Sequence, residues 1–173
     1  MNIAIDMMGG DYAPLEAIKG IKLYLQNTAE PNHLLLIGDE SILMDHLKEH
    51  LLAPEHLTII HAPQVIDMHE HPTKALKEKP QSSISVGFQQ LVSEKADAFI
   101  SAGNTGAMMV GSLFTIKAIE GVLRPTIGGY IPRENGKLGL MLDVGLNADC
   151  KPENLLQFAI LGSLYVKHVL NYD

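Results

Sequence analysis

Residues 101–107 combine two glycines with a side-chain amide and a hydroxyl, between two apolar runs. Gly103 and Gly106 have no Cβ, so backbone N–H groups in this stretch can approach a ligand closely. Asn104 and Thr105 add side-chain hydrogen bonds at the same place. A helix that follows would contribute free N–H groups and the positive end of its dipole. The stretch is therefore a candidate site for a phosphate or an oxyanion, and a turn that only redirects the chain is the alternative.

Two other polar turns follow apolar runs that are typical of strands. Asp6 precedes Gly9-Gly10-Asp11, and Asp143 precedes Gly145 and Asn147. In open α/β sheets, ligands bind beyond the carboxyl ends of the strands. If the strands are parallel, all three turns lie on one rim, and their repeated polarity favours a shared site. The alternative is that the two carboxylates and the glycines only shape the turns.

A basic cluster stands out in an acidic chain. Lys74, Lys77 and Lys79 lie directly before Ser82 and Ser83. A lysine here could counter the charge of a phosphate or steer an acidic partner, and a serine at a helix N-terminus could bind phosphate. Solvated lysines beside an ordinary helix cap remain the alternative.

Several familiar site motifs do not occur in the sequence. It contains no nucleoside-triphosphate loop, no Gly-x-Gly-x-x-Gly fingerprint and no Gly-x-Ser-x-Gly elbow. His69-Glu70-His71 resembles a pair of metal ligands, but no further ligand follows at a recognisable spacing. Asp143, Asn147 and Asp149 do not have the spacing of a calcium loop. We therefore expect neither a metal site nor a cofactor.

These residues need a scaffold, and the hydrophobic pattern predicts one. Short apolar runs predict strands, and apolar residues at helical spacing predict the helices between them. Predicted strands cover Asn2–Asp6, His33–Ile37, Leu57–His61, Asp97–Ser101, Thr126–Pro132 and Leu138–Asp143. Predicted helices begin at Pro14, Ile42, Ile84, after Gly106 and at Pro152, and the second ends at Leu51.

The alternation of strands and helices predicts an α/β fold. We expect three α/β/α layers around a mostly parallel sheet of Rossmann-like type, in one domain over residues 1–173. His33–Ile37 is continuously apolar, which fits a strand buried on both faces. Residues 62–80 contain three prolines and little periodicity, apart from a turn of helix near Thr73–Lys77. Residues 133–137 read as a hairpin-like turn.

Composition narrows the function classes. The chain has 173 residues, 46% of them hydrophobic, and a net charge of −7, which argues against a nucleic-acid surface. One cysteine allows no disulfide within the chain and fits a reducing compartment. The N-terminus lacks a basic leader, and the run from Thr105 to Ile116 is too short to span a bilayer. We therefore expect a cytoplasmic protein.

The polar motifs together resemble a known family. They occur in the order Asp6–Asp11 with Pro14, Ser82-Ser83, Ser101–Ala107, Glu120-Gly121, Arg124-Pro125, Leu142–Asp149, Gln157–Ala159 and Gly162-Ser163. In this combination the chain resembles the N-terminal half of the PlsX family, the bacterial acyl-acyl-carrier-protein:phosphate acyltransferases. Leu146 departs from the alanine that is usual in that family. The resemblance implies a fold related to phosphotransacetylase and isopropylmalate dehydrogenase.

The resemblance also implies an activity and partners. A fatty acyl group would pass from the acyl carrier protein to inorganic phosphate, giving acyl phosphate for phospholipid synthesis. The full-length protein would be a homodimer, with any peripheral membrane contact made by the half not present here.

Residue roles follow from the same resemblance. The amides of Gly103–Gly106, with Asn104 and Thr105, would hold phosphate or the oxyanion. Lys77 would counter the phosphate charge or help to dock the acidic carrier protein, and Asn147 would orient the phosphate. Asp6 and Asp143 would fix loops or bind a positive group, since carboxylates repel phosphate.

Two alternatives remain open. One is a phosphotransacetylase-like enzyme that uses acyl-coenzyme A. The other is an inactive phosphate-binding fragment.

Overall fold

The computed structural model describes residues 1–50 and 54–172. The chain forms two compact units, residues 1–117 and residues 118–173, where the sequence analysis treats it as one domain. Each unit is described by itself. The predicted end of the second helix, Leu51, lies outside the described residues.

The first unit contains a parallel sheet of four strands. These are β1 (Asn2–Asp6), β2 (His33–Gly38), β3 (Leu57–His61) and β4 (Ala98–Ile100). Their spatial order is β3-β2-β1-β4, and every neighbouring pair is parallel. All four predicted strands of this unit are confirmed.

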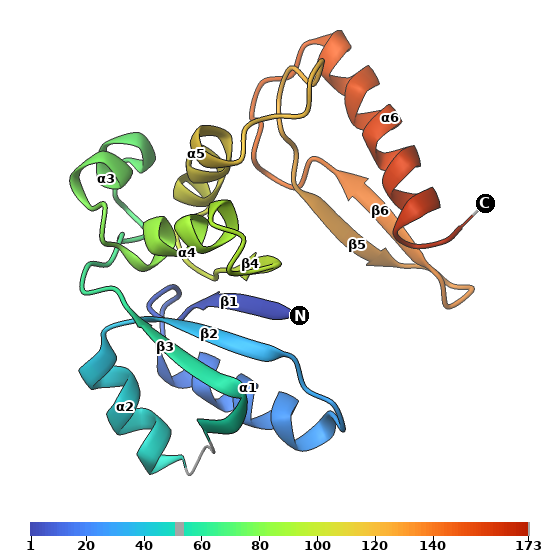
Figure 1. Ribbon diagram of the computed structural model, residues 1–173. Helices are drawn as coiled ribbons and strands as arrows, with labels where there is room; N and C mark the ends of the chain where they lie inside the picture. Colours follow the sequence, from blue (N-terminus) through green and yellow to red (C-terminus); the bar gives the residue numbers. More distant parts are fainter. Residues whose placement is uncertain (51–53, 173) are drawn as a thin grey trace. The chain divides into compact units, whose positions relative to one another are not determined.

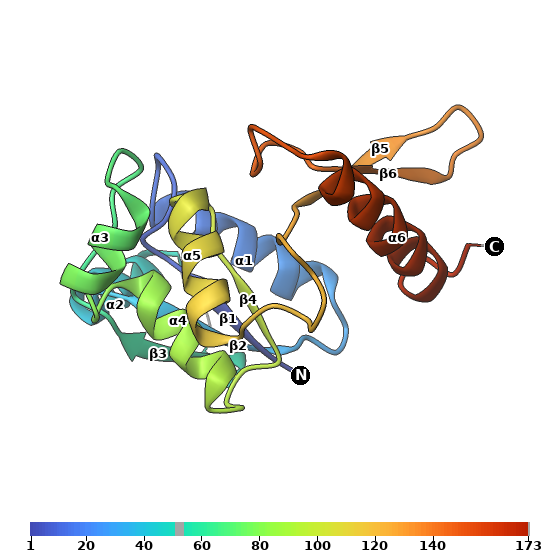
Figure 2. The same cartoon turned by 90° about the horizontal axis from the view of Figure 1, so that it is seen from above.

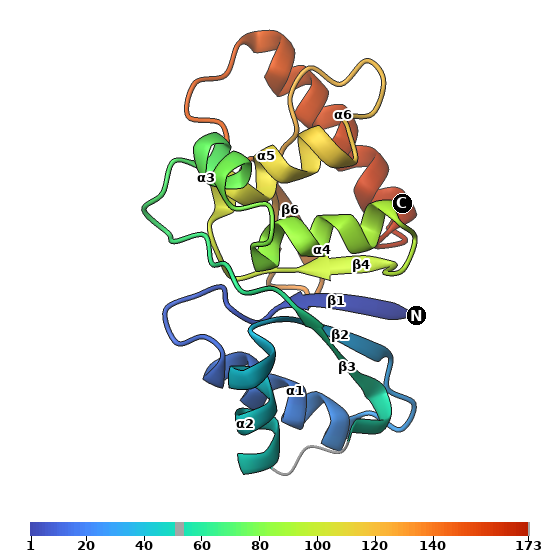
Figure 3. The ribbon, with the colours of Figure 1, turned by 60° about the vertical axis from the view of Figure 1, so that its left-hand side comes forward.

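Helices cover both faces of this sheet (Figure 1). One face carries α1 (Leu15–Asn27) and α2 (Glu40–Glu49), and a 3-10 turn, η1 (Pro54–His56), leads into β3. The other face carries α3 (Pro72–Glu78), α4 (Ser83–Val92) and α5 (Thr105–Thr115), as Figure 3 shows. The arrangement confirms the predicted α/β fold of three layers around a parallel sheet.

The central strand β2 is buried on both faces, as its apolar run predicts. Leu34 and Leu36 pack with α1 and α2, in a core that includes Ile18. Leu35 and Ile37 point the other way and join Ala4, Ala62 and Ala96. A third cluster lies among α3, α4 and α5, around Ile66, Ala75, Ile84, Phe88 and Ala107. Alternate residues of one strand thus support both helical layers.

The strand order creates a topological switch point between β1 and β4. From β1 the chain adds β2 and then β3 on one side, and it crosses back to place β4 on the other side of β1. The turns after β1 and β4 therefore lie at the same end of the sheet, and the chain leaves them toward opposite faces (Figure 3). Ligands of open α/β sheets bind at such a point.

The second unit is a hairpin covered by a helix. Strands β5 (Gly128–Pro132) and β6 (Leu138–Leu142) pair with each other in antiparallel register. Helix α6 (Pro152–His168) packs beside them (Figure 2). Both strands and the turn between them are confirmed. The condition that all strands are parallel is not met for β6, because the short turn at 133–137 returns the chain directly alongside β5.

A membrane-spanning helix needs about 20 mostly apolar residues. Among the described residues, no helix is long and apolar enough to meet that requirement.

Candidate functional site

The turns after β1 and β4 are joined by a carboxylate. Asp6 is 3% exposed. Its Oδ2 accepts a hydrogen bond from Ser101 Oγ at 2.6 Å, and its Oδ1 accepts one from the N–H of Met8 at 3.0 Å. Ser101 Oγ in turn accepts from the N–H of Gly103 at 3.0 Å. Asp6 therefore fixes both turns at the switch point, and its oxygens are occupied by protein donors.

Two glycines let these turns touch. A Cβ built on Gly9 would lie 2.6 Å from the Gly103 nitrogen and 2.9 Å from its Cα. A Cβ on Gly103 would lie 3.3 Å from the Cα of Gly9. These glycines serve the close approach of one backbone to another. Since the Gly103 N–H also binds Ser101, it is not free to bind a substrate in this structure.

Asn104 connects the end of β4 to the irregular segment after β3. It is the N-cap of α5, where its Oδ1 accepts from the N–H of Ala107 at 2.9 Å. Its Nδ2 donates to the carbonyls of Asp67 at 2.9 Å, Glu70 at 3.1 Å and Met68 at 3.3 Å. The side chain is 5% exposed, and both N–H groups are committed to the protein. These contacts position the loop and the helix rather than leave an amide free for a ligand.

The first turn of α5 keeps unused donors beside this anchor. Thr105 is exposed and Gly106 is half-buried. The first N–H groups of a helix have no partner within the helix, and neither the Thr105 nor the Gly106 N–H forms a hydrogen bond within residues 1–50 and 54–172. We name these two residues the α5 corner. Two N–H groups, a hydroxyl and the helix dipole can hold an anion there.

A large apolar cavity adjoins the same turns. Its volume is about 540 Å³, and it lies between α1 and the β1–β4 side of the sheet. Its walls include Ile3, Ile5, Tyr24, Leu34 and Ile100, and its polar edge includes Asp6, Gly9 and Ser101. A mainly apolar ligand fits such walls.

The two serines are buried parts of a helix cap. Ser82 is fully buried and Ser83 is 1% exposed. Ser82 Oγ accepts from the N–H of Ser85 at 3.2 Å and bonds Ser85 Oγ at 2.9 Å. Ser82 is the N-cap of α4. These contacts are those of an ordinary helix cap, the alternative to phosphate binding that the sequence also allowed.

The three lysines of the basic cluster have different surroundings. Lys79 forms an ion pair with Glu70 and also donates to the Val65 carbonyl at 2.7 Å. Its hydrogen bond to Glu70, with the Asp67 N–H, holds the pKa of Glu70 below its usual value. Lys74 Nζ lies 4.0 Å from Glu78 Oε1, at the limit of an ion pair. Lys77 is exposed and has no ion pair within the described part of the chain. Lys77 is thus the member available to an anionic partner.

In the second unit, Asp143 fixes its own loop. Its Oδ1 accepts from the N–H groups of Leu146 at 3.2 Å and Ile127 at 3.3 Å. Its Oδ2 accepts from the N–H of Asn147 at 2.6 Å and from Asn147 Nδ2 at 2.7 Å. Burial alone would raise the pKa of Asp143, but the hydrogen bonds from Asn147, Leu146 and Ile127 outweigh it and lower that pKa.

Asn147 is committed in the same way. Its Nδ2 also donates to the Pro125 carbonyl at 2.9 Å. The Asp143–Asn147 turn follows a strand of the antiparallel hairpin, so the structure does not place it on the parallel rim with Asp6 and Ser101. Its part in a shared site stays a prediction.

Several residues that organise these turns were absent from the predicted site. Ser101 lies within the predicted stretch, but its link to Asp6 spans 95 positions and leaves no mark on local spacing. Arg124 Nη1 donates to the Asp149 carbonyl at 2.9 Å, and Gln157 bonds both Leu123 and Gly121. These two residues belong to the motifs of the resemblance: Arg124 joins two loops to each other, and Gln157 ties the loop at 121–123 to α6.

The chain matches the family described as "Fatty acid synthesis protein" over residues 1–173. It is 44% identical over 173 residues to a phosphate acyltransferase of Thermoanaerobacterium thermosaccharolyticum, covering all of this chain and 50% of that protein. It is 45% identical to one of Acetivibrio thermocellus, covering all of this chain and 50% of that protein. It is 45% identical over 172 residues to one of Salinibacter ruber, covering 99% of this chain and 51% of that protein. The chain thus spans about half the length of these curated relatives.

Proposed function

Because the chain belongs to the fatty acid synthesis protein family, we propose that it forms part of a cytoplasmic acyltransferase. The enzyme moves a fatty acyl group from acyl-acyl-carrier-protein to inorganic phosphate and gives acyl phosphate for phospholipid synthesis. The relatives at 44–45% identity are named phosphate acyltransferases, which supports phosphate as the acceptor. No cofactor is required, because phosphate itself is the nucleophile.

The observation that carries this proposal is the switch point between β1 and β4. The apolar cavity borders the turns after β1 and β4, and the α5 corner follows the turn after β4 directly. Phosphate matches the free N–H groups and the hydroxyl of the α5 corner. An acyl chain matches the apolar walls beside the turn of Ser101. The cavity and the α5 corner share only the turn that follows β4, and this shared turn supports a reaction that joins an acyl group to phosphate.

The proposed reaction needs no nucleophilic side chain, because phosphate is the nucleophile. An oxygen of phosphate attacks the carbonyl carbon of the thioester, and a C–O bond forms as negative charge develops on the carbonyl oxygen. The C–S bond then breaks, and the thiolate of the carrier leaves with the bonding electrons. Positioning and stabilisation of the oxyanion therefore supply the catalysis. We assign donors at the α5 corner to Thr105 and Gly106, and positioning roles to Asp6, Ser101 and Asn104.

In this proposal Gly103, Ser82 and Ser83 shape the site rather than bind phosphate. Gly103 lets the turns meet, and Ser82 and Ser83 form the buried start of α4. Asp143 and Asn147 are assigned to fixing their own loop. The whole enzyme acts as a homodimer in this proposal.

The proposal is tested by measuring which acyl donor the enzyme uses and whether the product is acyl phosphate. The protein that contains these 173 residues should convert acyl-acyl-carrier-protein and phosphate to acyl phosphate, detected as its hydroxamate after trapping with hydroxylamine. Acyl-coenzyme A should be the poorer donor. Faster turnover with acyl-coenzyme A would favour a phosphotransacetylase-like enzyme instead. We expect little activity from the 173 residues alone, since they span about half the length of the relatives named phosphate acyltransferase.

Lys77 provides a test of carrier docking. Lys77→Glu reverses the one lysine of the cluster that has no ion pair among the described residues, so we expect KM for acyl-acyl-carrier-protein to rise at least about threefold at low salt, and less at high salt. Lys95→Glu, another exposed lysine, is the control. Equal KM values for the two variants would remove Lys77 from the docking surface.

A further inference from the structure

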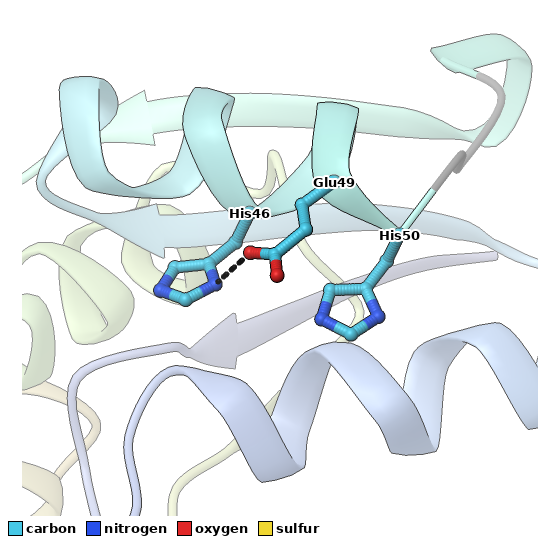
Figure 4. Close-up of side chains that lie close together, drawn as sticks. All are labelled: His46, Glu49 and His50. Atoms are coloured by element: carbon cyan, nitrogen blue, oxygen red, sulfur yellow. Dashed lines mark ion pairs between the residues drawn. The ribbon is translucent and has the colours of Figure 1, made fainter.

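Three potential metal ligands lie together on α2, away from the turns of the candidate site. His46, Glu49 and His50 occupy positions i, i+3 and i+4, which face the same side of a helix. One ligand atom from each lies within 4.8 Å of the others. Figure 4 shows both imidazoles directed toward α1, with the Glu49 carboxylate between them.

The histidine nitrogens in this cluster lack partners. His46 Nδ1 and His50 Nε2 are buried and form no hydrogen bond with any described residue. Only one other buried side-chain polar atom in the described ranges, Thr126 Oγ1, shares that condition. Glu49 Oε2 lies 3.7 Å from His46 Nδ1, which is too long for a hydrogen bond. Buried polar atoms without partners are costly, and two of them in one cluster point to a missing ligand.

From this cluster we infer that His46, Glu49 and His50 form a binding site for a divalent zinc ion. Two imidazole nitrogens and one carboxylate oxygen are ligands that zinc prefers. Bond lengths of about 2.0–2.2 Å place the ligand atoms of a tetrahedral zinc about 3.4 Å apart. The ligand atoms lie within 4.8 Å of one another in this structure, so zinc binding requires the side chains to rotate closer together, and water completes the fourth position.

The surroundings suit a cation. His50 is the C-cap of α2, so the ion would lie at the negative end of the helix dipole. The two imidazoles are half-buried and lie 6.4 Å apart by ring centroid, with their planes 24° apart. Glu49 is exposed and provides the entry side. The inference concerns metal binding and is independent of the proposed acyl transfer.

Zinc titration of the tag-free protein tests the site. Isothermal titration calorimetry should detect one zinc ion per chain. His46→Gln combined with His50→Gln should weaken binding at least about tenfold. The matched control is His69→Gln with His71→Gln, because His69-Glu70-His71 is a rival cluster whose glutamate is already paired with Lys79. The control should bind zinc as the unmodified protein does.

Glu49→Gln keeps the test valid if the double histidine variant does not fold. The Glu49 side chain is 71% exposed, so the fold does not depend on it, and its loss should also weaken zinc binding. Zinc should raise the thermal unfolding midpoint of the unmodified protein and not that of the folded variants. No stoichiometric zinc binding, or unchanged affinity in either the double histidine variant or Glu49→Gln, would overturn the inference.

Discussion

The hydrogen bond from Ser101 to Asp6 holds together two turns that lie far apart in the sequence. Ser101→Ala removes this bond and also the acceptor of the Gly103 N–H. We expect a loss of about 2–3 kcal/mol in the free energy of unfolding of the first unit, since a carboxylate and an N–H both lose a partner in a largely buried place. Urea unfolding followed at the amide signals of β1 and β4 measures it.

Ser163→Ala is the matched control for that change. Ser163 is exposed on α6, and among the described residues its Oγ bonds only the Ala159 carbonyl, so its loss should alter stability by less than about 0.5 kcal/mol. If Ser101→Ala costs no more than the control, the Asp6–Ser101 link does not hold the turns.

Asp143 makes the stability of its loop depend on pH in the acidic range. Its pKa in the folded chain lies below the ordinary value of 3.8, so folding favours the charged carboxylate. The stabilisation is complete at pH values above that ordinary pKa, and it is lost as the pH falls from there through the lower pKa of the folded state. The amide signals of Leu146 and Asn147 should report loop opening in that range.

Asp143→Asn should remove this acid dependence and weaken the loop at neutral pH, because the four donors around the carboxylate lose its charge. An Asn variant whose loop opens in acid as the unmodified chain does would contradict the assignment to Asp143.

At the residue scale the sequence drew attention to residues 6–11 and 101–107, and the structure shows contacts of these residues that local spacing does not reveal. Asp6, Gly103 and Asn104 could be selected from the sequence, because a glycine or a polar residue directly after an apolar run indicates a turn at the end of a strand. The partners of Asn104 were not visible, because the carbonyls of residues 67–70 lie 34 to 37 positions away. The histidine pair His46 and His50 has a local signal in the sequence, the i, i+4 spacing on a predicted helix.

At the scale of elements, the two turns at the switch point depend on backbone contact. Gly9→Ala would place a Cβ 2.6 Å from the Gly103 nitrogen, where backbone has to move. We expect a destabilisation of about 1–3 kcal/mol from this overpacking. Thermal unfolding measures it.

Gly20→Ala separates contact from the general effect of replacing glycine. Gly20 is exposed inside α1, and a Cβ there meets nothing within 4 Å. This change should stabilise the chain by about 0.5–1 kcal/mol, because alanine favours the helix. Similar effects of both substitutions would show that the two turns do not need to touch.

Elements were predictable where hydrophobic runs are long and local. β2 is one continuous apolar run, and α4 begins at a serine that caps it, so both were evident from sequence. The direction of β6 relative to β5 was also evident, from the hairpin-like turn at 133–137. That β5 and β6 form a sheet of their own was not evident, because the hydrophobic pattern of a strand does not show which sheet it joins.

At the scale of the whole molecule, the first unit contains the switch point, the α5 corner and an apolar cavity. The chain is acidic overall, with a net charge of −7, so its attraction for phosphate must be local. Backbone N–H groups of a helix supply a local attraction without lysine or arginine. The central claim is therefore that the α5 corner binds the phosphate acceptor.

Steady-state kinetics of Thr105→Val test that claim most directly. The substitution keeps the shape of an exposed side chain and removes its hydroxyl, and Thr73→Val, also exposed, is the matched control. In the protein that contains this chain, Thr105→Val should lower kcat/KM for phosphate at least about tenfold, while Thr73→Val leaves it unchanged. A Thr105→Val enzyme with the same kcat/KM for phosphate as the Thr73→Val control would contradict the account.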